Sequence, residues 1–185
     1  MAAIGDAAGR PVSSFAPIES PKARVLILGS MPGQASLAAQ RYYAHPQNAF
    51  WRILGEIFGF APDADYLQRI AALSAAEVAL WDVLQSCVRP GSLDANIARD
   101  SLIANDFTGF FQRHRLIARI GFNGAAAQQL YLRHVQPQLP PHLRHQHLRL
   151  PSTSPANASL NHAKKLDAWR ALFPPVNLDP WTSAH

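Results

Sequence analysis

The stretch Tyr42–Trp51 places one amide side chain between a pair of aromatic residues and an amphipathic segment, a spacing that can serve chemistry. Asn48 directly precedes that segment and is a good helix N-cap, because its side-chain oxygen can accept a backbone N–H of the first turn. The same neutral amide can instead hold a water molecule against a sugar carbon, acting through position rather than basicity. Both roles are compatible if the backbone caps the helix while the side chain faces a cleft.

Two tyrosines, Tyr42 and Tyr43, lie just before this turn. An aromatic ring at the mouth of a cleft can stack on an extruded base, which contributes about 1–3 kcal/mol. For either ring, packing in the core is the alternative.

A second polar stretch, Pro151–Asn157, carries serine and threonine hydroxyls between two prolines. Hydroxyls on a rigid turn can bind phosphates and fix the register of DNA. An ordinary loop held by local Ser and Thr hydrogen bonds accounts for the same residues.

Charged residues lie near the end of the apolar segment Val78–Leu84, at a place where a strand is expected to end. Asp82 and Asp94 are the carboxylates of interest, although Asp94 can simply cap a helix that begins at Ala95. Arg89 in the same loop is a candidate phosphate contact, with a solvated surface arginine as the alternative.

Several other kinds of site are not supported. The turn Gly29–Gly33 lacks the Gly-Lys-Ser/Thr ending of a P-loop, but its glycines allow a backbone to approach a flat ligand closely. Neither this turn nor Ser152–Ser154 contains the Gly-x-Ser-x-Gly elbow of a serine hydrolase. His142, His145 and His147 have no nearby carboxylate or cysteine to complete a ligand set, so we expect no metal and no cofactor.

The composition favours a small globular protein with a polyanionic partner. A chain of 185 residues fits one domain, and 48% hydrophobic residues can fill its core. The net charge of +5 favours nucleic acid, although scattered solvated arginines would give the same value. The single cysteine, Cys87, excludes a disulfide framework and a four-cysteine zinc or iron–sulfur site, which indicates a reduced, cytoplasmic setting. No apolar run reaches the roughly 18 residues of a membrane span.

The apolar pattern predicts alternating strands and helices. The expected strands are Arg24–Gly29, Val78–Leu84, Leu116–Phe122 and His147–Leu150. The expected helices are Ala49–Phe58, Ala64–Leu73, Phe107–His114, Ala125–His134 and Ser159–Leu172. This order indicates an α/β protein, a single three-layer αβα domain with a central four-stranded, mainly parallel sheet. Ligands of such sheets gather beyond the carboxyl ends of the strands, where all the polar stretches above lie.

The expected domain spans residues 21–173. Residues 1–20 and 174–185 mix Ala, Gly, Pro and Ser without a helix or strand period, and we expect both ends to be loosely ordered.

Taken together, Gly29–Gly33, Ser36-Leu37 and Tyr42–Trp51 resemble the first motif of the hypoxanthine-DNA glycosylases, a family within the uracil-DNA glycosylase superfamily. The family pattern is Gly-Ser-x-Pro-Gly, Ser-Leu and Tyr-Tyr-Ala-His-Pro-x-Asn-x-Phe-Trp. Mismatch-specific uracil and thymine glycosylases are similar through a related His-Pro-x-Asn-x-Phe-Trp stretch. The resemblance covers about residues 24–173, and Pro151–Asn157 matches the second motif of the superfamily.

The resemblance implies a monofunctional glycosylase that flips a deaminated base from DNA and hydrolyses its N-glycosidic bond. It makes Asn48 the catalytic residue that positions water, Tyr43 the stacking platform, and Ala156 or Asn157 the residue that fills the gap left by the base. The base contacts it implies are Gly29, Ser30, Met31, Pro32, Gly33, Tyr43, His45 and Asn123. The DNA contacts expected with it are Ser152, Thr153, Ser154, Pro155, Ala156, Asn157 and Arg89.

Two positions depart from the superfamily pattern. Met31 stands where the best-known uracil enzymes have an acidic residue, and Leu150 stands where they have a histidine.

The sequence leaves three hypotheses for the function: a glycosylase for hypoxanthine, with uracil and xanthine as further substrates; a mismatch-specific uracil or thymine glycosylase; and a DNA-binding protein without catalysis. Each predicts a monomer that binds double-stranded DNA, with single-stranded DNA as an alternative.

Overall fold

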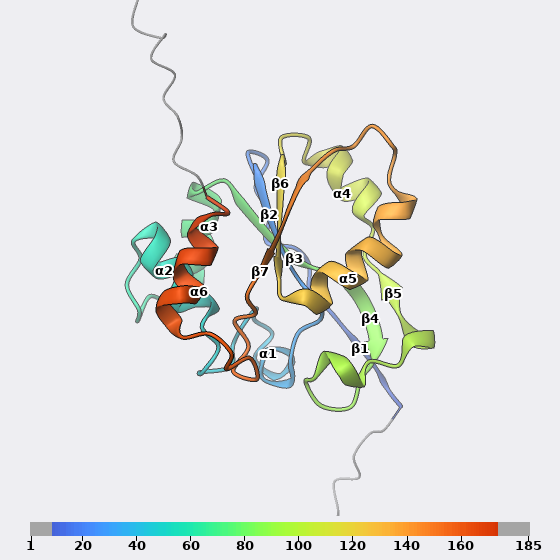
Figure 1. Ribbon diagram of the computed structural model, residues 1–185, viewed down its shortest axis with the longest axis horizontal. Helices are drawn as coiled ribbons and strands as arrows, with labels where there is room; N and C mark the ends of the chain where they lie inside the picture. Colours follow the sequence, from blue (N-terminus) through green and yellow to red (C-terminus); the bar gives the residue numbers. More distant parts are fainter. Residues whose placement is uncertain (1–8, 174–185) are drawn as a thin grey trace, which may run out of the picture.

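The computed structural model describes residues 9–173 of the chain, and its centre is a four-stranded parallel sheet (Figure 1). The strands are Val25–Gly29 (β2), Val78–Asp82 (β3), Arg119–Asn123 (β6) and Gln146–Leu150 (β7). Their spatial order is β3-β2-β6-β7, and every neighbouring pair is parallel. The predicted sheet is confirmed, with small shifts at the strand ends.

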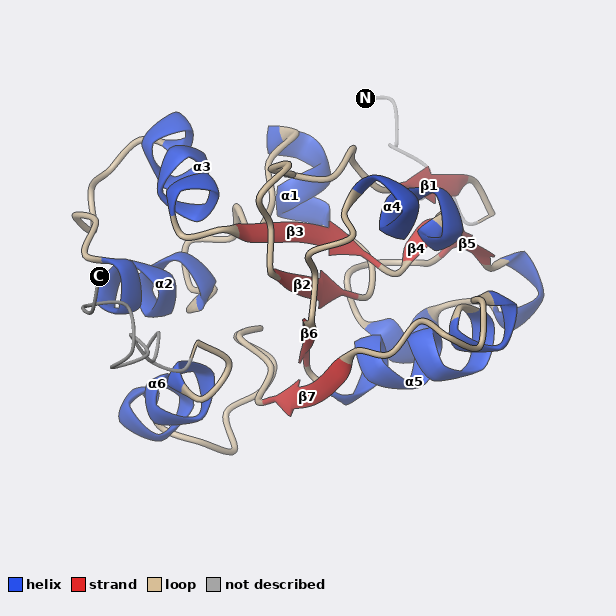
Figure 2. Cartoon of the chain, turned by 90° about the horizontal axis from the view of Figure 1, so that it is seen from above, coloured by secondary structure: helices blue, strands red, loops and turns tan. Residues whose placement is uncertain are grey.

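Helices cover both faces of this sheet, because its strands carry apolar side chains on both sides. They are α1 (Gln34–Ala39), α2 (Phe50–Phe58), α3 (Tyr66–Ala75), α4 (Phe107–Arg113), α5 (Ala125–His134) and α6 (His162–Arg170). Side chains of α2, α3 and α6 pack with strand residues such as Ile27 and Leu80. Those of α4 and α5 pack with Leu26 and Trp81, on the other face of the same strands. The two groups of helices lie on either side of the sheet in Figures 1 and 2, which confirms the three-layer architecture.

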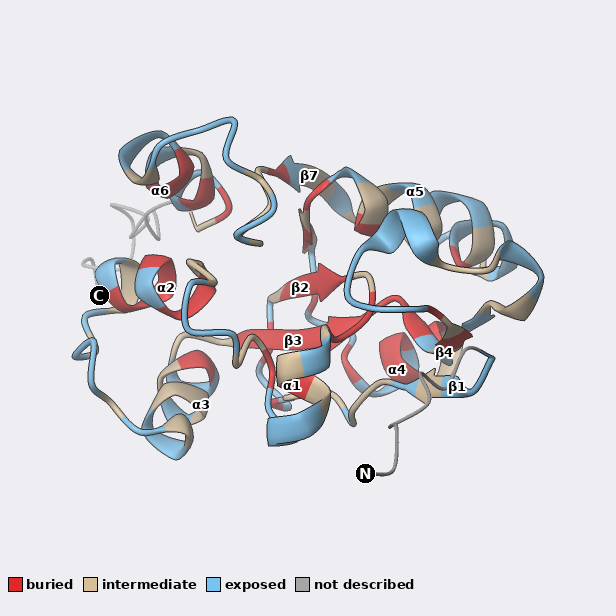
Figure 3. Cartoon of the chain, turned by 90° about the horizontal axis from the view of Figure 1, so that it is seen from below, coloured by how far each residue is buried: buried red, intermediate tan, exposed pale blue. Residues whose placement is uncertain are grey.

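Helix α2 has the amphipathic pattern that its sequence predicts. Phe50, Ile53 and Leu54 are fully buried against the sheet, and Trp51 is nearly so. The helix ends at Gly59, whose φ of 79° lies in the left-handed region that glycine adopts without strain. Helix α2 is thus held firmly by the core (Figure 3), and the turn that precedes it is held at the same time.

A second, smaller sheet was not predicted. It is antiparallel, with the order β1-β4-β5, and consists of Pro11–Ser13 (β1), Leu84–Val88 (β4) and Ile103–Ala104 (β5). The expected strand Val78–Leu84 therefore stops at Asp82, and Leu84 begins a strand of the other sheet. Strands of three and two residues, such as β1 and β5, show no measurable period, which explains why the sequence pattern missed these two.

The start of the chain is more ordered than expected. Strand β1 pairs with β4, and Ile18 forms a β-bridge with Leu80 of the central sheet. The expectation of a loosely ordered segment up to residue 20 is therefore wrong for residues 11–18. Residues 1–8 and the predicted tail 174–185 lie outside the described residues. Within residues 9–173, no helix has the length and apolar character needed to cross a bilayer.

Trp169 of α6 connects this core to the loop after β7, which gives a test of the packing. Its ring is fully buried with its edge against Phe50, and its indole N–H donates to the Pro151 carbonyl at 3.0 Å. We expect Trp169→Ala to lower the free energy of unfolding by about 3–5 kcal/mol, measured by urea denaturation, because it leaves a cavity and an unpaired carbonyl. Leu132→Ala, at a side chain that is 43% exposed, should change it by roughly 0.5 kcal/mol or less. If Trp169→Ala and the wild type unfold at the same urea concentration, the contribution of this ring to stability is contradicted.

Candidate active site

The carboxyl ends of the four parallel strands surround a cavity of about 460 Å³. Segments that are far apart in the chain meet there, because every parallel strand ends at the same edge of the sheet. Residues predicted for the site that line the cavity are Gly29, Ser30, Met31, Pro32, Gly33, Tyr43, His45, Asn48, Asn123, Ser152, Thr153, Ser154, Pro155 and Ala156. Two predicted residues, Arg89 and Asn157, do not line it.

Asn48 lies at the turn before α2 and is half-buried. Its Oδ1 accepts the backbone N–H of Phe50 at 3.0 Å, so the carbonyl end of the amide holds the start of the helix. Its Nδ2 makes no hydrogen bond with residues 9–173. One side chain thus fixes the first turn and also presents polar atoms to the cavity, as the two compatible roles of Asn48 require.

The ring of Tyr43 is positioned by the core. It stacks on Phe50 with ring centroids 3.8 Å apart and planes at 20°, and its φ of 53° is left-handed. Its hydroxyl is buried without a hydrogen-bond partner among the described residues, and burial raises the pKa of this phenol. Tyr42 is only 4% exposed, and its hydroxyl donates to the Ala16 carbonyl at 3.0 Å. Tyr42 therefore belongs mainly to the core, whereas Tyr43 forms part of the cavity wall.

Thr153 joins three segments at this edge of the sheet. Its backbone N–H donates to Asn123 Oδ1 at 2.9 Å, its hydroxyl accepts from Asn123 Nδ2 at 2.9 Å, and its carbonyl accepts the Ala49 N–H at 3.0 Å. Thr153 is 1% exposed. Thr153 therefore serves first to hold these segments together, and its expected contact with a phosphate stays a prediction.

The rest of the loop 151–157 is held by its own side chains. Ser152 Oγ accepts the Ser154 N–H at 3.2 Å, and Ser154 Oγ accepts the Ala156 N–H at 3.3 Å. Asn157 donates from Nδ2 to the Ser152 carbonyl at 3.2 Å, so it supports the loop, while Pro155 and Ala156 are exposed. A hydroxyl that accepts a backbone N–H can still donate its own proton. The two serines therefore keep a donor for a ligand, and Ala156 is more exposed than Asn157.

Arg89 is not a surface arginine. Its side chain is 1% exposed, and the guanidinium donates to the carbonyl of Gly91 at 3.2 Å and to those of Met31 and Pro32. The predicted phosphate contact is therefore wrong: Arg89 holds the turn after β2 in place. Asp94 does not cap a helix either, since it accepts the Ser30 hydroxyl at 2.7 Å and lies 3.8 Å from Arg89.

Two serines to which the sequence analysis assigned no contact also line the cavity. Ser36 Oγ accepts the Ala44 N–H at 3.1 Å, and Ser92 Oγ accepts the Gln34 N–H at 2.9 Å. Ser36 belongs to the family motif, although the motif does not show that it holds Ala44. No local sequence signal marks Ser92, because its partner Gln34 lies 58 positions away in the chain. Asp82, which the pattern did mark, ends β3 at 3% exposure and lines the cavity, and burial raises the pKa of its carboxyl to about 7.

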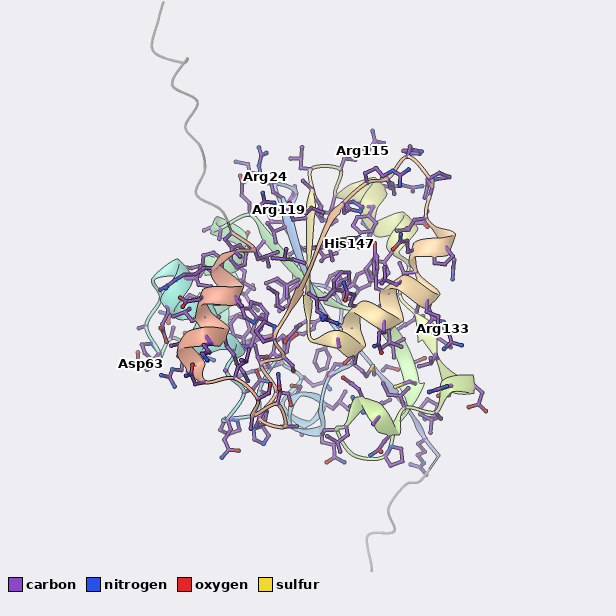
Figure 4. All side chains as sticks on the ribbon, viewed as in Figure 1. Arg24, Asp63, Arg115, Arg119, Arg133 and His147 are labelled. Carbon is purple, nitrogen blue, oxygen red and sulfur yellow. The ribbon has the colours of Figure 1, made fainter. Side chains whose placement is uncertain are left out.

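Part of the positive charge lies away from this cavity. Arg24, Arg115 and Arg119 lie near the edge of the sheet at which the strands begin, opposite the edge that carries the cavity (Figure 4). Arg24 pairs with Glu77 at 2.8 Å. These three residues fit the alternative interpretation of the net charge, as scattered and solvated arginines. The net charge alone therefore does not locate a nucleic-acid surface.

Comparison with known proteins agrees with this arrangement. The family model described as the uracil DNA glycosylase superfamily matches residues 16–173. The chain belongs to this superfamily. The match includes all the strands of the parallel sheet and every residue that lines the cavity.

Two curated proteins are similar in sequence, and both are named hypoxanthine DNA glycosylase. The protein from Methanosarcina acetivorans is 33% identical over 150 residues, which are 80% of this chain and 89% of that protein. The protein from Methanosarcina barkeri is 35% identical over 111 residues, 60% of this chain and 69% of that protein. An NMR structure from M. acetivorans, described as a candidate uracil DNA glycosylase, aligns with a TM-score of 0.73 at 28% identity. That alignment covers 88% of this chain and 97% of the other.

The hydroxyl of Thr153 provides a test of this glycosylase-like site. We expect Thr153→Val to lower the free energy of unfolding by about 1–3 kcal/mol, because Asn123 Nδ2 loses its acceptor inside the protein. Thr153→Ser keeps the hydroxyl and should cost clearly less. Urea denaturation of both variants measures the difference. A valine variant as stable as the wild type would contradict the contribution of this hydrogen bond, and any loss of stability in the serine variant measures the methyl group alone.

Proposed function

We propose that this chain is a monofunctional DNA glycosylase that flips hypoxanthine out of DNA and hydrolyses its N-glycosidic bond, leaving an abasic site. Uracil and xanthine are further substrates in this proposal. Membership of the superfamily and the names of the two curated relatives support it. The observation that carries it is the meeting of Asn48, Tyr43 and the turn Gly29–Gly33 around one cavity.

The cavity wall suits a flat ligand. The face of Tyr43 that packs on Phe50 fixes the ring, and the ring can then stack on a base for about 1–3 kcal/mol. Arg89 holds the carbonyls of Met31 and Pro32, which keeps the backbone of this turn in one conformation. Asn123 is clamped by Thr153 and retains one amide N–H for the edge of the base.

Hydrolysis requires a water oxygen to form a bond to the sugar C1′ while the bond from C1′ to the base nitrogen breaks. The base leaves with the electron pair and takes up a proton, and the hydroxyl remains on C1′. Asn48 holds the water, and backbone dipoles and the phosphates of DNA stabilise the oxocarbenium-like sugar. Met31 and Leu150 are 6% and 3% exposed and apolar, so neither position supplies a strong base or an imidazole.

The DNA partner in this proposal is double-stranded, and the protein acts as a monomer. Deaminated bases pair badly, so flipping them out of the duplex costs less than flipping a normal base. The hydroxyls of Ser152 and Ser154 hold phosphates, and the exposed tip Pro155-Ala156 enters the gap left by the base.

A mismatch-specific uracil or thymine glycosylase is the second candidate. One observation supports this second candidate: the similar NMR structure is described as a candidate uracil DNA glycosylase. Base release from duplexes with I·T, U·G and T·G pairs separates the two. Release mainly from I·T supports the first proposal, whereas release mainly from U·G and T·G supports the second.

We expect Asn48→Ala to lower the rate of hypoxanthine release from an inosine-containing duplex by about 100-fold or more, while binding of the duplex persists. Release is measured by alkaline cleavage at abasic sites under single-turnover conditions, and binding by a gel-shift assay. Gln47→Ala is the matched control, since this neighbouring amide is exposed and does not line the cavity. Unchanged release by Asn48→Ala contradicts the catalytic role, and binding without any release by the wild type indicates a protein that lacks catalysis.

A further inference from the structure

Asp82 presents an unused carboxylate oxygen to the cavity. Its Oδ2 accepts the Ser14 hydroxyl at 2.8 Å, whereas its Oδ1 makes no hydrogen bond with the described residues. A Cβ built on Gly29 would lie 2.5 Å from this Oδ1 and 2.9 Å from the Tyr43 hydroxyl, which also lacks a partner. Two unpaired polar atoms therefore lie close together next to the backbone of Gly29.

Within residues 9–173, no salt bridge involves this carboxylate. Arg89, which lies behind the turn after β2 and lowers the pKa of Asp82 from there, donates to backbone carbonyls and pairs with Asp94. A buried polar atom without a partner is unfavourable, and the penalty is removed when a ligand supplies the missing partner. Since an ionised carboxylate can only accept hydrogen bonds, the missing partner of Oδ1 is a donor.

Deamination creates such a donor on a base. In adenine and cytosine the ring nitrogen beside the amino group is an acceptor, and in hypoxanthine and uracil the same nitrogen carries a hydrogen. We propose that Asp82 is a specificity-determining residue whose Oδ1 accepts this ring N–H, so that the cavity selects deaminated bases over adenine and cytosine. This inference rests on the proposed glycosylase function.

The charge of Asp82 sets the direction of this selection. An ionised carboxylate faces the ring nitrogen of adenine with a lone pair against a lone pair, which disfavours binding. A protonated carboxyl has one donor and one acceptor and would match the ring nitrogen and amino group of adenine. Selection for hypoxanthine therefore requires the ionised form.

Several groups from other elements control that ionisation. Burial raises the pKa of Asp82 to about 7, the Ser14 hydroxyl and Arg89 lower it, and Asp94 raises it. Tyr42 and Tyr43, which also face Asp82, stay neutral because burial raises the pKa of each phenol. His45 lines the same cavity, so a variant at Asp82 itself is needed to assign a pH effect.

The test is single-turnover release of hypoxanthine across pH. For the wild type we expect the rate to rise about tenfold between about pH 6 and about pH 8, as Asp82 ionises. Asp82→Asn cannot ionise, so it should lose this rise. It should also bind and process inosine at pH 8 about tenfold less selectively over adenine, because an amide can turn its NH₂ toward an acceptor nitrogen. Asp167→Asn removes an exposed carboxylate of α6 and should behave as the wild type.

Ser14→Ala provides a second variant outside the cavity wall. Loss of the hydroxyl that favours the charged form raises the pKa of Asp82, so the rise in rate should move to higher pH. Circular dichroism reveals whether Asp82→Asn folds. If it does not, the pH–rate profile of Ser14→Ala tests the inference instead: a shift to higher pH supports it, and an unshifted profile overturns it.

The outcomes distinguish this inference from the proposed function. A wild type that releases hypoxanthine, together with an Asp82→Asn variant of the same rate, selectivity and pH profile, overturns the role of Asp82 alone. A wild type that releases no base overturns the proposed function. The inference is then decided by equilibrium binding of inosine-containing and adenine-containing duplexes: a preference for inosine that Asp82→Asn loses supports it, and an unchanged preference overturns it.

Discussion

The hydrogen bonds of Thr153 are the constraint on which the rest of the site depends. A parallel sheet brings the ends of its strands to one edge, but it does not determine how the loops beyond that edge lie relative to one another. Thr153 binds Asn123 at the end of β6 through two bonds and Ala49 at the start of α2 through a third. Three segments separated by long stretches of chain are thereby joined in a buried, polar cluster. Because Asn48 lies next to Ala49, its position relative to Asn123 follows from these bonds.

Most polar groups around the cavity have two tasks, and the division between them has a physical logic. Asn48, Asn123 and the loop serines each use part of their hydrogen-bonding capacity to hold backbone, which fixes their orientation before a ligand arrives. Pre-organised groups lose little entropy when they bind, and they keep their geometry as charge develops. Asp82 Oδ1 and the Tyr43 hydroxyl differ, because they remain unpaired beside Gly29. A ligand that pairs with these two atoms removes the cost of leaving them unpaired, and this gain adds to its binding free energy.

The sequence predicts those features that depend on local pattern. The period of Phe50, Ile53 and Leu54 predicts α2, and the apolar segments predict alternating strands and helices, and hence a mainly parallel sheet whose strand ends meet at the glycine turn and at Asn48. The small sheet could not be predicted in this way, since β5 has two residues and its pairing partner is far along the chain. Arg89 and Thr153 were assigned to DNA from residue type alone. Their burial depends on where three segments meet, which no local window contains.

Met31 and Leu150 show how the site can differ from the family pattern without losing its electrostatic character. Met31 packs into the core cluster with α4 and α5, and Leu150 packs into the cluster with α2 and α6, so both positions serve the core. The buried carboxyl group of the cavity comes instead from Asp82, on the strand next to β2. A negative group in the cavity favours the positive charge of an oxocarbenium-like transition state, whether or not it touches water. In the role that we propose for Asp82, a carboxyl at the end of β3 rather than β2 therefore keeps the sign of the field at the cavity and contacts the base instead of the water.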